Sequence, residues 1–407
     1  MNKVARRSLL LAILVSACGA AGPATADGTR ARELGIPFAG EPGALNAITD
    51  VAGVEVGQVT LIRGDGELLV GKGPVRTGVT VVHPRGKDST TGVFGGWFTL
   101  NASGEMTGTT WLQERGLIEG PIAITNTHSV GVVRDAAVEW MVGKGWSADW
   151  HAPVVAETYD GGLNDINGFH VTSAHALQAM SSATSGAIAE GAVGGGTGMV
   201  CNGFKGGIGT ASRRFEVGGR KYTIGVLVQC NYNWDGDDLR LGGRRVDHLL
   251  PVGEHCFTDR SIERHNDWYP YCGDAGARSV SMNSRDGSII VIIATDAPLL
   301  PHQLARVAKR PSLALGRLGA VSTAGSGDIF VAFSTANAGR VDESNHAEVS
   351  VFPNYALTTV FTAAVQATEE AIVNAMTAAE TVIGASGFRV EEMPEDEVRA
   401  VFRRSGD

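Results

Sequence analysis

A serine at the start of an apolar run is the residue of this chain best suited to chemistry. Ser288 follows Gly287 and precedes residues 289–294, an unbroken series of Ile, Val and Ala. Such a run predicts a strand buried on both faces, with Ser288 at its exposed start. A cut between Gly287 and Ser288 would give Ser288 a free α-amine, which titrates near ~8 and could take the proton of its own hydroxyl. An ordinary turn before a strand has the same local pattern.

A second serine lies close to a carboxylate before another apolar run. Ser326 and Asp328 stand two residues apart, directly before the predicted strand 329–334. Residues two apart share a face of a strand, so both side chains would lie together if this strand begins early. The Gly-x-Ser-x-Gly elbow of the commonest serine hydrolases is absent, and a turn is again the alternative.

The glycine-rich and acidic clusters do not have the spacing of cofactor or metal sites. Glycines before Lys72 imitate a phosphate-binding loop, but Gly73 stands where Ser or Thr is required. The run 194–198 is followed by Met199 where a dinucleotide fingerprint needs a glycine, and the acidic cluster 235–238 lacks the downstream Glu of a calcium loop. No histidine pair has metal-ligand spacing on a helix, so we expect no cofactor and no metal.

Composition favours a compact globular protein. The chain has 407 residues, of which 43% are hydrophobic, and a net charge of −9 without a basic run beyond the N-terminus. Nucleic acid is therefore an improbable partner. The N-terminus itself reads as a signal peptide over 1–26: basic residues, the apolar stretch 9–15 and the small residues 24–26. Lipidation at Cys18 and a twin-arginine signal are the alternatives, and no other segment reads as membrane-spanning.

Four cysteines remain after residue 26, in a compartment where disulfides persist. Cys256 and Cys272 flank a polar segment and are the pair we expect to be bonded. Cys230 ends an apolar run and is expected to be a buried thiol. Cys201 has no assigned partner.

Strands and helices alternate along the chain, which predicts a single α/β domain in which the segments on both sides of Ser288 share a sheet. Strands are expected at 54–57, 77–82, 122–125, 207–229, 289–294 and 329–334. Helices are expected at 130–142, 174–182 and 298–310, with one or two more within 355–383.

Several strings, in order along nearly the whole chain after residue 26, resemble the DmpA family of self-processing serine aminopeptidases, which includes the β-peptidyl aminopeptidases. They are Arg-Glu-Leu-Gly-Ile-Pro-Phe at 32–38, Gly-Ala-Leu-Asn-Ala-Ile-Thr-Asp-Val at 43–51, Gly-Gly-Gly-Thr-Gly-Met at 194–199, Phe-Lys-Gly-Gly-Ile-Gly at 204–209, Gly-Ser-Ile-Ile-Val at 287–291, Ala-Thr-Asp-Ala-Pro-Leu at 294–299 and Val-Gln-Ala-Thr-Glu-Glu-Ala at 365–371.

The resemblance implies a four-layer αββα sandwich, similar to the N-terminal nucleophile hydrolases but differently connected. It also implies cleavage into an α fragment, 27–287, and a β fragment, 288–407, and assembly as a tetramer. By position, Ser288 is the nucleophile, and Ser326 and Asp328 support it. The family carries Glu in its β-peptide branch where this chain has the shorter Asp328.

Three further residues receive roles from the resemblance. Asn231 would contribute to the oxyanion hole, and Glu157 would hold the amino terminus of the substrate. Tyr159 matches the active-site Tyr of the L-aminopeptidase branch. The expected function is an exported, self-processing aminopeptidase acting on short peptides, amino acid amides or esters through an acyl-enzyme on Ser288. The alternatives are a preference for N-terminal β-amino acids and, more distantly, an uncleaved ligand-binding protein.

Overall fold

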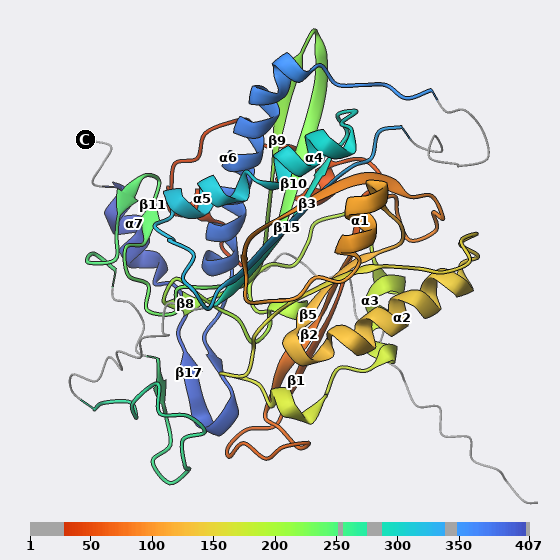
Figure 1. The fold of residues 1–407 in the computed structure, drawn as a ribbon. Helices are drawn as coiled ribbons and strands as arrows, with labels where there is room; N and C mark the ends of the chain where they lie inside the picture. Colours follow the sequence, from red (N-terminus) through yellow and green to blue (C-terminus); the bar gives the residue numbers. More distant parts are fainter. Residues whose placement is uncertain (1–27, 251–254, 275–286, 338–347, 404–407) are drawn as a thin grey trace, which may run out of the picture.

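Two β-sheets lie face to face in the computed structural model, which describes residues 28–250, 255–274, 287–337 and 348–403 (Figure 1). The first sheet has four strands in the order β1-β2-β5-β6: β1 (Glu55–Arg63), β2 (Val75–His83), β5 (Ile122–Asn126) and β6 (Val154–Thr158). The second has six in the order β4-β3-β15-β14-β10-β9: β4 (Leu117–Ile118), β3 (Val93–Ala102), β15 (Gly327–Ser334), β14 (Ser288–Thr295), β10 (Arg220–Asn231) and β9 (Gly207–Val217).

Strand β14 lies inside the second sheet and is buried along its whole length. Ile290 and Ile292 pack between the two sheets, whereas Ile289, Val291 and Ile293 pack in the core on the opposite face. This alternation explains why the run lacks polar residues, because both faces of the strand are covered by apolar layers. The strand predicted after Gly287 is confirmed.

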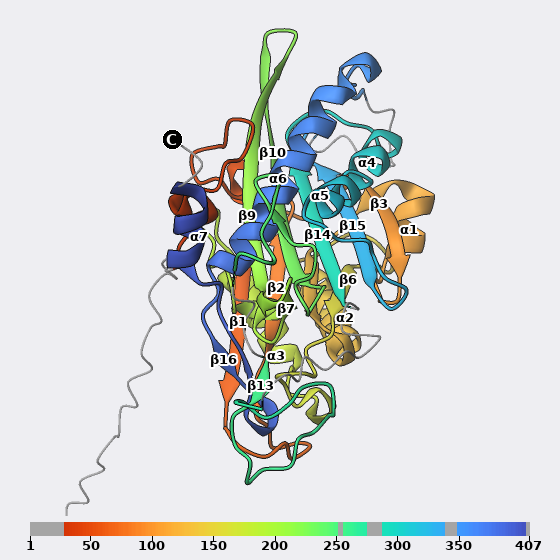
Figure 2. The same cartoon turned by 90° about the vertical axis from the view of Figure 1, so that its left-hand side faces the viewer.

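Helices cover the outer face of each sheet and complete four layers, as Figure 2 shows from the side. The first sheet carries α2 (Val130–Gly143) and α3 (Ser173–Ser182), and the second carries α4 (Pro301–Ala308), α5 (Pro311–Arg317) and α6 (Leu357–Thr377). The remaining elements are α1 (Thr109–Arg115), α7 (Glu395–Arg403), β7 (Val200–Cys201), β8 (Phe204–Lys205), β11 (Arg240–Leu241), β12 (Arg244–Arg245), β13 (Cys256–Phe257), β16 (Val382–Ile383) and β17 (Phe388–Val390).

Two predicted helices have different bounds in the structure. The segment 298–310 holds only α4, which begins at Pro301, and Pro311 starts the separate helix α5. A proline lacks the backbone N–H that a continuing helix needs, so it favours a new first turn. In the segment 355–383, one helix ends at Thr377 and the last residues form strand β16.

One prediction about the cysteines is confirmed and one is wrong. Cys256 is bonded to Cys272 as expected. Cys230 is not a free thiol, because it forms a disulfide with Cys201. The apolar run before Cys230 explains its burial, but it gave no sign that the hairpin β7–β8 folds back beside the end of β10.

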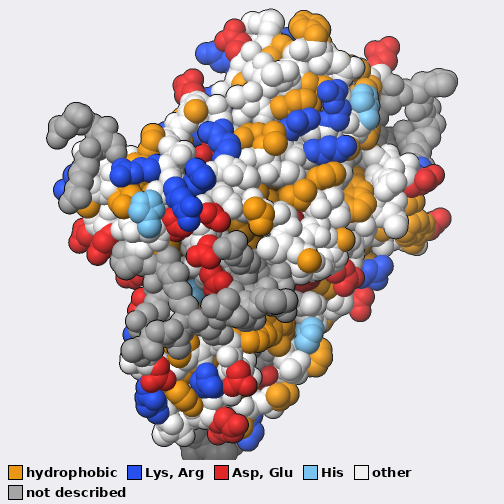
Figure 3. Space-filling model, turned by 60° about the vertical axis from the view of Figure 1, so that its left-hand side comes forward, with side chains coloured by type: hydrophobic (Ala, Val, Ile, Leu, Met, Phe, Trp, Pro, Cys, Tyr) orange, Lys and Arg blue, Asp and Glu red, His pale blue; other side chains and the backbone are white. Residues whose placement is uncertain are grey.

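The described residues contain no helix long and apolar enough to cross a membrane. The expected signal peptide and Cys18 lie outside the described residues. The face drawn in Figure 3 mixes acidic, basic and apolar side chains.

Candidate active site

The ends of three adjacent strands bring the predicted nucleophile and its neighbours together. Ser288 begins β14, where it pairs with Asn231 at the end of antiparallel β10 and with Gly327 at the start of parallel β15. Ser288 stands at the start of the strand as predicted, but it is buried, with 6% of its surface exposed, so the expected exposure is wrong. The sheet register itself therefore places an amide side chain and a glycine beside the serine.

A cavity of about 530 Å³ opens at this edge of the sheet. Its walls include four of the residues expected in the site, which are Ser288, Asn231, Glu157 and Tyr159. Gly287 also lines it, so the proposed cleavage site and the expected amine-binding carboxylate share one cavity. The volume lies within the range of small-molecule sites in enzymes.

Ser326 and Asp328 lie together, but they do not line the large cavity. The Ser326 hydroxyl donates a hydrogen bond of 2.6 Å to Asp328 Oδ1, and the two residues line a separate cavity of about 20 Å³. Burial raises the pKa of Asp328, opposed by hydrogen bonds from Ser326, Ser322 and the backbone N–H of Ile289. Because Ile289 follows Ser288 directly, this carboxylate contacts the backbone at the start of β14, and it does not line the large cavity.

Glu157 is the buried carboxylate of the large cavity, with 3% of its surface exposed. Its Oε1 accepts the backbone N–H of Glu105 at 2.9 Å, and its Oε2 accepts the Thr127 hydroxyl at 2.5 Å. Burial raises its pKa, and these hydrogen bonds act in the opposite direction. Gly104 leaves room at the carboxylate, because a Cβ there would lie 3.1 Å from Oε1.

The Asn231 side chain is held in one orientation. Its Oδ1 accepts the backbone N–H of Val200 at 2.9 Å, and its Nδ2 donates to the backbone carbonyl of Tyr159 at 2.9 Å. An amide nitrogen has two hydrogens, so one N–H remains for a ligand in the cavity. Tyr159 itself is 38% exposed, and burial of its hydroxyl raises its pKa.

Two glycines provide space around the serine. Gly287 has a φ of +155°, and a Cβ there would lie 2.2 Å from the Asn231 carbonyl oxygen. At Gly327 a Cβ would lie 2.9 Å from the Ser288 hydroxyl oxygen and 2.6 Å from the Ser103 carbonyl oxygen. A larger residue at either position would displace the backbone that places the serine.

The sequence and the structure both match known proteins over most of their length. The sequence pattern of Peptidase family S58 matches residues 46–390. The beta-peptidyl aminopeptidase BapA of Sphingosinicella microcystinivorans is 56% identical over 388 residues, which cover 94% of each chain. The chain belongs to Peptidase family S58.

Solved structures of related proteins agree with this S58 membership. The Burkholderia sp. beta-aminopeptidase superposes with a TM-score of 0.77 at 42% identity, and the L-aminopeptidase D-Ala-esterase/amidase from Ochrobactrum anthropi with 0.80 at 43%. Both comparisons cover 93% of this chain and 99% of the other. The Ochrobactrum protein is described as a prototype for the serine aminopeptidases and a variant of the Ntn hydrolase fold. This chain is therefore a hydrolase of the serine aminopeptidase type with that fold, as its sequence predicted.

The S58 site also contains an aromatic wall that the sequence did not reveal. Trp234, Trp268 and Tyr269 line the same cavity as the serine, and the rings of Trp234 and Tyr269 stack with centroids 6.5 Å apart. Two of the three come from the segment closed by the Cys256–Cys272 disulfide, to which the sequence gave no role. Thr127 was missed as well, because a single hydroxyl carries no recognisable pattern.

In the described parts of this S58 peptidase, no group of three or more His, Cys, Asp or Glu side chains is placed to hold a metal ion.

Proposed function

We propose that the chain cleaves itself between Gly287 and Ser288 and that Ser288 is then the nucleophile of an aminopeptidase for short peptides that begin with a β-amino acid. The fragments would be 27–287 and 288–407. The observation that carries this proposal is a single cavity with the serine at a strand start and a buried carboxylate, Glu157, on its wall.

Each of these groups has one task in the reaction. The protonated amine of the substrate pairs with Glu157, which places the adjacent carbonyl carbon near Ser288. The Ser288 hydroxyl adds to that carbon while the α-amine of the same residue takes the hydroxyl proton. The resulting oxyanion accepts a hydrogen bond from the second side-chain N–H of Asn231.

The α-ammonium then gives its proton to the leaving nitrogen as the scissile C–N bond breaks. An ester remains on Ser288. Water attacks this ester, the α-amine takes a proton from the water, and the proton returns to the serine oxygen when the amino acid leaves. The steps return the enzyme to its starting protonation state, as a hydrolase requires.

Asp328 and Ser326 support the serine from the interior. Asp328 accepts the N–H of Ile289 and so orients the backbone that carries the α-amine. The Ser326 hydroxyl bonded to Asp328 leaves one carboxylate oxygen for other donors. These two residues thus position the base and do not touch the substrate.

The preference for β-amino acids rests on the names of two relatives at 56% and 43% identity, both beta-peptidyl aminopeptidases. A β-amino acid separates its amine from its carbonyl by one more carbon than an α-amino acid. The second candidate is an L-aminopeptidase, favoured by Tyr159 on the cavity wall and by the Ochrobactrum relative.

Export and assembly belong to the same proposal. We expect residues 1–26 to be removed and the enzyme to reach the periplasm or the medium, with lipidation at Cys18 as the alternative. The resemblance to the DmpA family supports a tetramer.

A denaturing gel and a panel of substrates test this function. Wild-type protein should give two bands, with the smaller fragment starting at Ser288 by mass spectrometry, and Ser288→Ala should give one band without activity. The p-nitroanilides of β-homoalanine and L-alanine then separate the two candidates by their kcat/KM. A fully active single chain, or activity in Ser288→Ala, would refute the proposal.

A further inference from the structure

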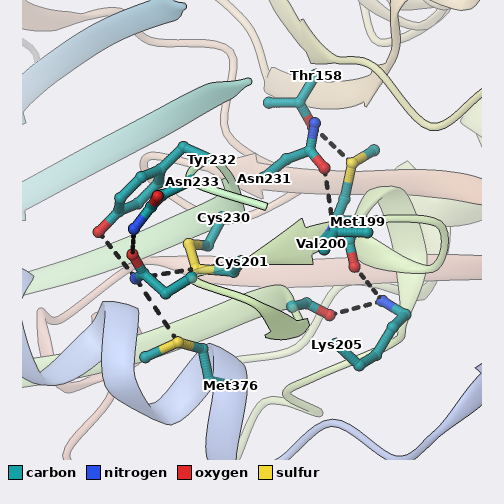
Figure 4. The surroundings of a disulfide bond; sticks show 12 residues. Thr158, Met199, Val200, Cys201, Lys205, Cys230, Asn231, Tyr232, Asn233 and Met376 are labelled. Atoms are coloured by element: carbon teal, nitrogen blue, oxygen red, sulfur yellow. Dashed lines mark hydrogen bonds between the residues drawn. A yellow bond between two sulfur atoms is a disulfide. The ribbon is translucent and has the colours of Figure 1, made fainter. Parts of the chain in front are cut away.

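The hairpin β7–β8 contacts the end of β10 beside the oxyanion residue (Figure 4). Three bonds join the two segments residue by residue. The Val200 N–H donates to Asn231 Oδ1 at 2.9 Å, Cys201 is bonded to Cys230, and the Asn202 N–H donates to the Tyr232 carbonyl at 2.8 Å. Cys201 directly follows Val200, and Cys230 directly precedes Asn231. The disulfide therefore joins the chain neighbours of the two residues that form the Val200–Asn231 hydrogen bond.

Lys205 fixes the same hairpin from the other side. It pairs with Val200 across the hairpin, and its Nζ donates to the carbonyls of Met199, Gly206 and Gly196 at 2.6, 2.7 and 3.2 Å. An ammonium has three N–H donors, so these three carbonyls satisfy all of them. Burial lowers the pKa of Lys205 to about 7.

Neither group reaches the large cavity. Lys205 and both cysteines are fully buried, and none of them lines the wall that holds Ser288. Their connection to the reaction runs through Val200 and then Asn231. If the Val200 N–H moved away, Asn231 Oδ1 would lose its partner, and the amide could rotate and turn its free N–H away from the oxyanion.

We infer that the Cys201–Cys230 disulfide and Lys205 are positioning groups that keep the Val200 N–H on Asn231 and thereby fix the amide donor of the oxyanion hole. This inference rests on the oxyanion role proposed above for Asn231. It gives the disulfide a function in catalysis beyond its contribution to stability. It also predicts that full activity requires an oxidising compartment.

A coupling experiment between these groups and Asn231 tests the inference. Cys201→Ala/Cys230→Ala and Lys205→Met are each made alone and together with Asn231→Ala, and rates are expressed per mole of processed chain. Loss of one oxyanion donor lowers kcat by ~10² to 10³. Misorientation should cost a fraction of that, on the order of tenfold in kcat with KM within about twofold.

In the Asn231→Ala background, both changes should have almost no further effect, because the donor they orient is already gone. Binding of a substrate-derived aldehyde, which forms an oxyanion on the serine, should weaken in parallel with kcat. The matched control is Cys256→Ala/Cys272→Ala, which removes the other disulfide. Any loss in this control should be the same with and without Asn231→Ala.

The outcomes separate the two proposals. If Asn231→Ala keeps the wild-type kcat, the oxyanion role itself is wrong. If Asn231→Ala is slow but the cysteine and lysine changes reduce kcat by the same factor in both backgrounds, these groups do not act through Asn231. Failure of both Cys201→Ala/Cys230→Ala and Lys205→Met to fold would also overturn the inference, since it assigns them to positioning and not to folding. If only one folds, the other variant still completes the test.

Discussion

Replacing Glu157 by Gln should remove substrate binding while leaving folding and self-cleavage intact. The substitution keeps the shape of the side chain but removes its charge. Gln Oε1 can still accept the N–H of Glu105, and the Thr127 hydroxyl can accept from the new amide because a hydroxyl both donates and accepts. The cut before Ser288 involves no cationic amine, so it does not need the carboxylate.

The size of the effect follows from burial of the ion pair. Only 3% of Glu157 is exposed, so the amine of the substrate is shielded from water when it binds there. Removing one partner of such a hydrogen-bonded charge pair costs about 2 to 5 kcal/mol. Since about 1.4 kcal/mol is a factor of ten, kcat/KM for substrates with a free amine should fall by about 30-fold to 4,000-fold.

Although Glu157→Gln should lower activity, it should not lower the stability of the fold. Burial raises the pKa of Glu157, so the folded state holds this proton to higher pH than the unfolded state does. Ionisation therefore lowers the free energy of unfolding as pH rises through that window, and Gln avoids this cost. Glu157→Gln should unfold at an equal or higher temperature than wild type at pH 7. In wild type, KM should rise as pH falls through the raised pKa.

Steady-state kinetics with free and N-acetylated forms of one substrate provide the assay. Wild type should strongly prefer the free amine, and Glu157→Gln should lose most of that preference while still giving two bands on a denaturing gel. Glu105→Gln is the matched control, because its side chain carries the same charge and lines the same cavity but is exposed. An unchanged preference in Glu157→Gln, or an equal loss in Glu105→Gln, would refute the assignment.

Three other substitutions probe the surroundings of Ser288. Gly327→Ala should abolish the proposed processing, because its Cβ would lie 2.9 Å from the Ser288 hydroxyl oxygen, whereas Gly131→Ala, with no atom within 4 Å, should process normally on the same gel. Trp268→Ala should raise KM for substrates with an aromatic leaving group by about 2- to 12-fold, as expected for loss of one aromatic contact, and Trp150→Ala, an exposed Trp outside this cavity, should not. In a pH profile of kcat/KM, the loss of activity on protonating Asp328 should appear above the ordinary carboxylic range because burial raises its pKa, and Asp328→Asn should remove that limb.

The strand at Ser288 could be predicted because its burial is written in the sequence itself. Six consecutive apolar residues leave no polar face, so such a strand requires a layer on each side, and the structure provides a second sheet and helices. Helix ends were less certain. The predicted helix 298–310 ended before Pro311, as the structure requires, but α4 covers only Pro301–Ala308, and the helix α5 that begins at Pro311 was not predicted.

Ser288 could be singled out from its local pattern, but Glu157, Asn231 and Tyr159 could be identified only by resemblance, since none of them lies in a recognisable motif. Glu157, Asn231 and Ser288 meet because the ends of β6 and β10 and the start of β14 lie at the same cavity, and sheet register is a long-range property. The partner of Cys230 was missed for the same reason. Its bond to Cys201 depends on the hairpin β7–β8, whose strands have only two residues each. No local pattern indicates that this hairpin lies beside β10.

The arrangement divides the polar residues into two groups with different tasks. Glu157, Asn231 and Tyr159 line the large cavity, where a substrate would contact them, whereas Asp328 bonds to Ser326 and to the backbone of β14 away from that cavity. In an uncut chain the nitrogen of Ser288 is an amide and cannot act as a base, so the interior carboxylate is the titratable group in contact with that strand start. The proposed cleavage would turn the same nitrogen into an amine, which the carboxylate would hold in place. Changes in the interior group should therefore affect both cleavage and turnover, whereas changes in Glu157 should affect turnover alone.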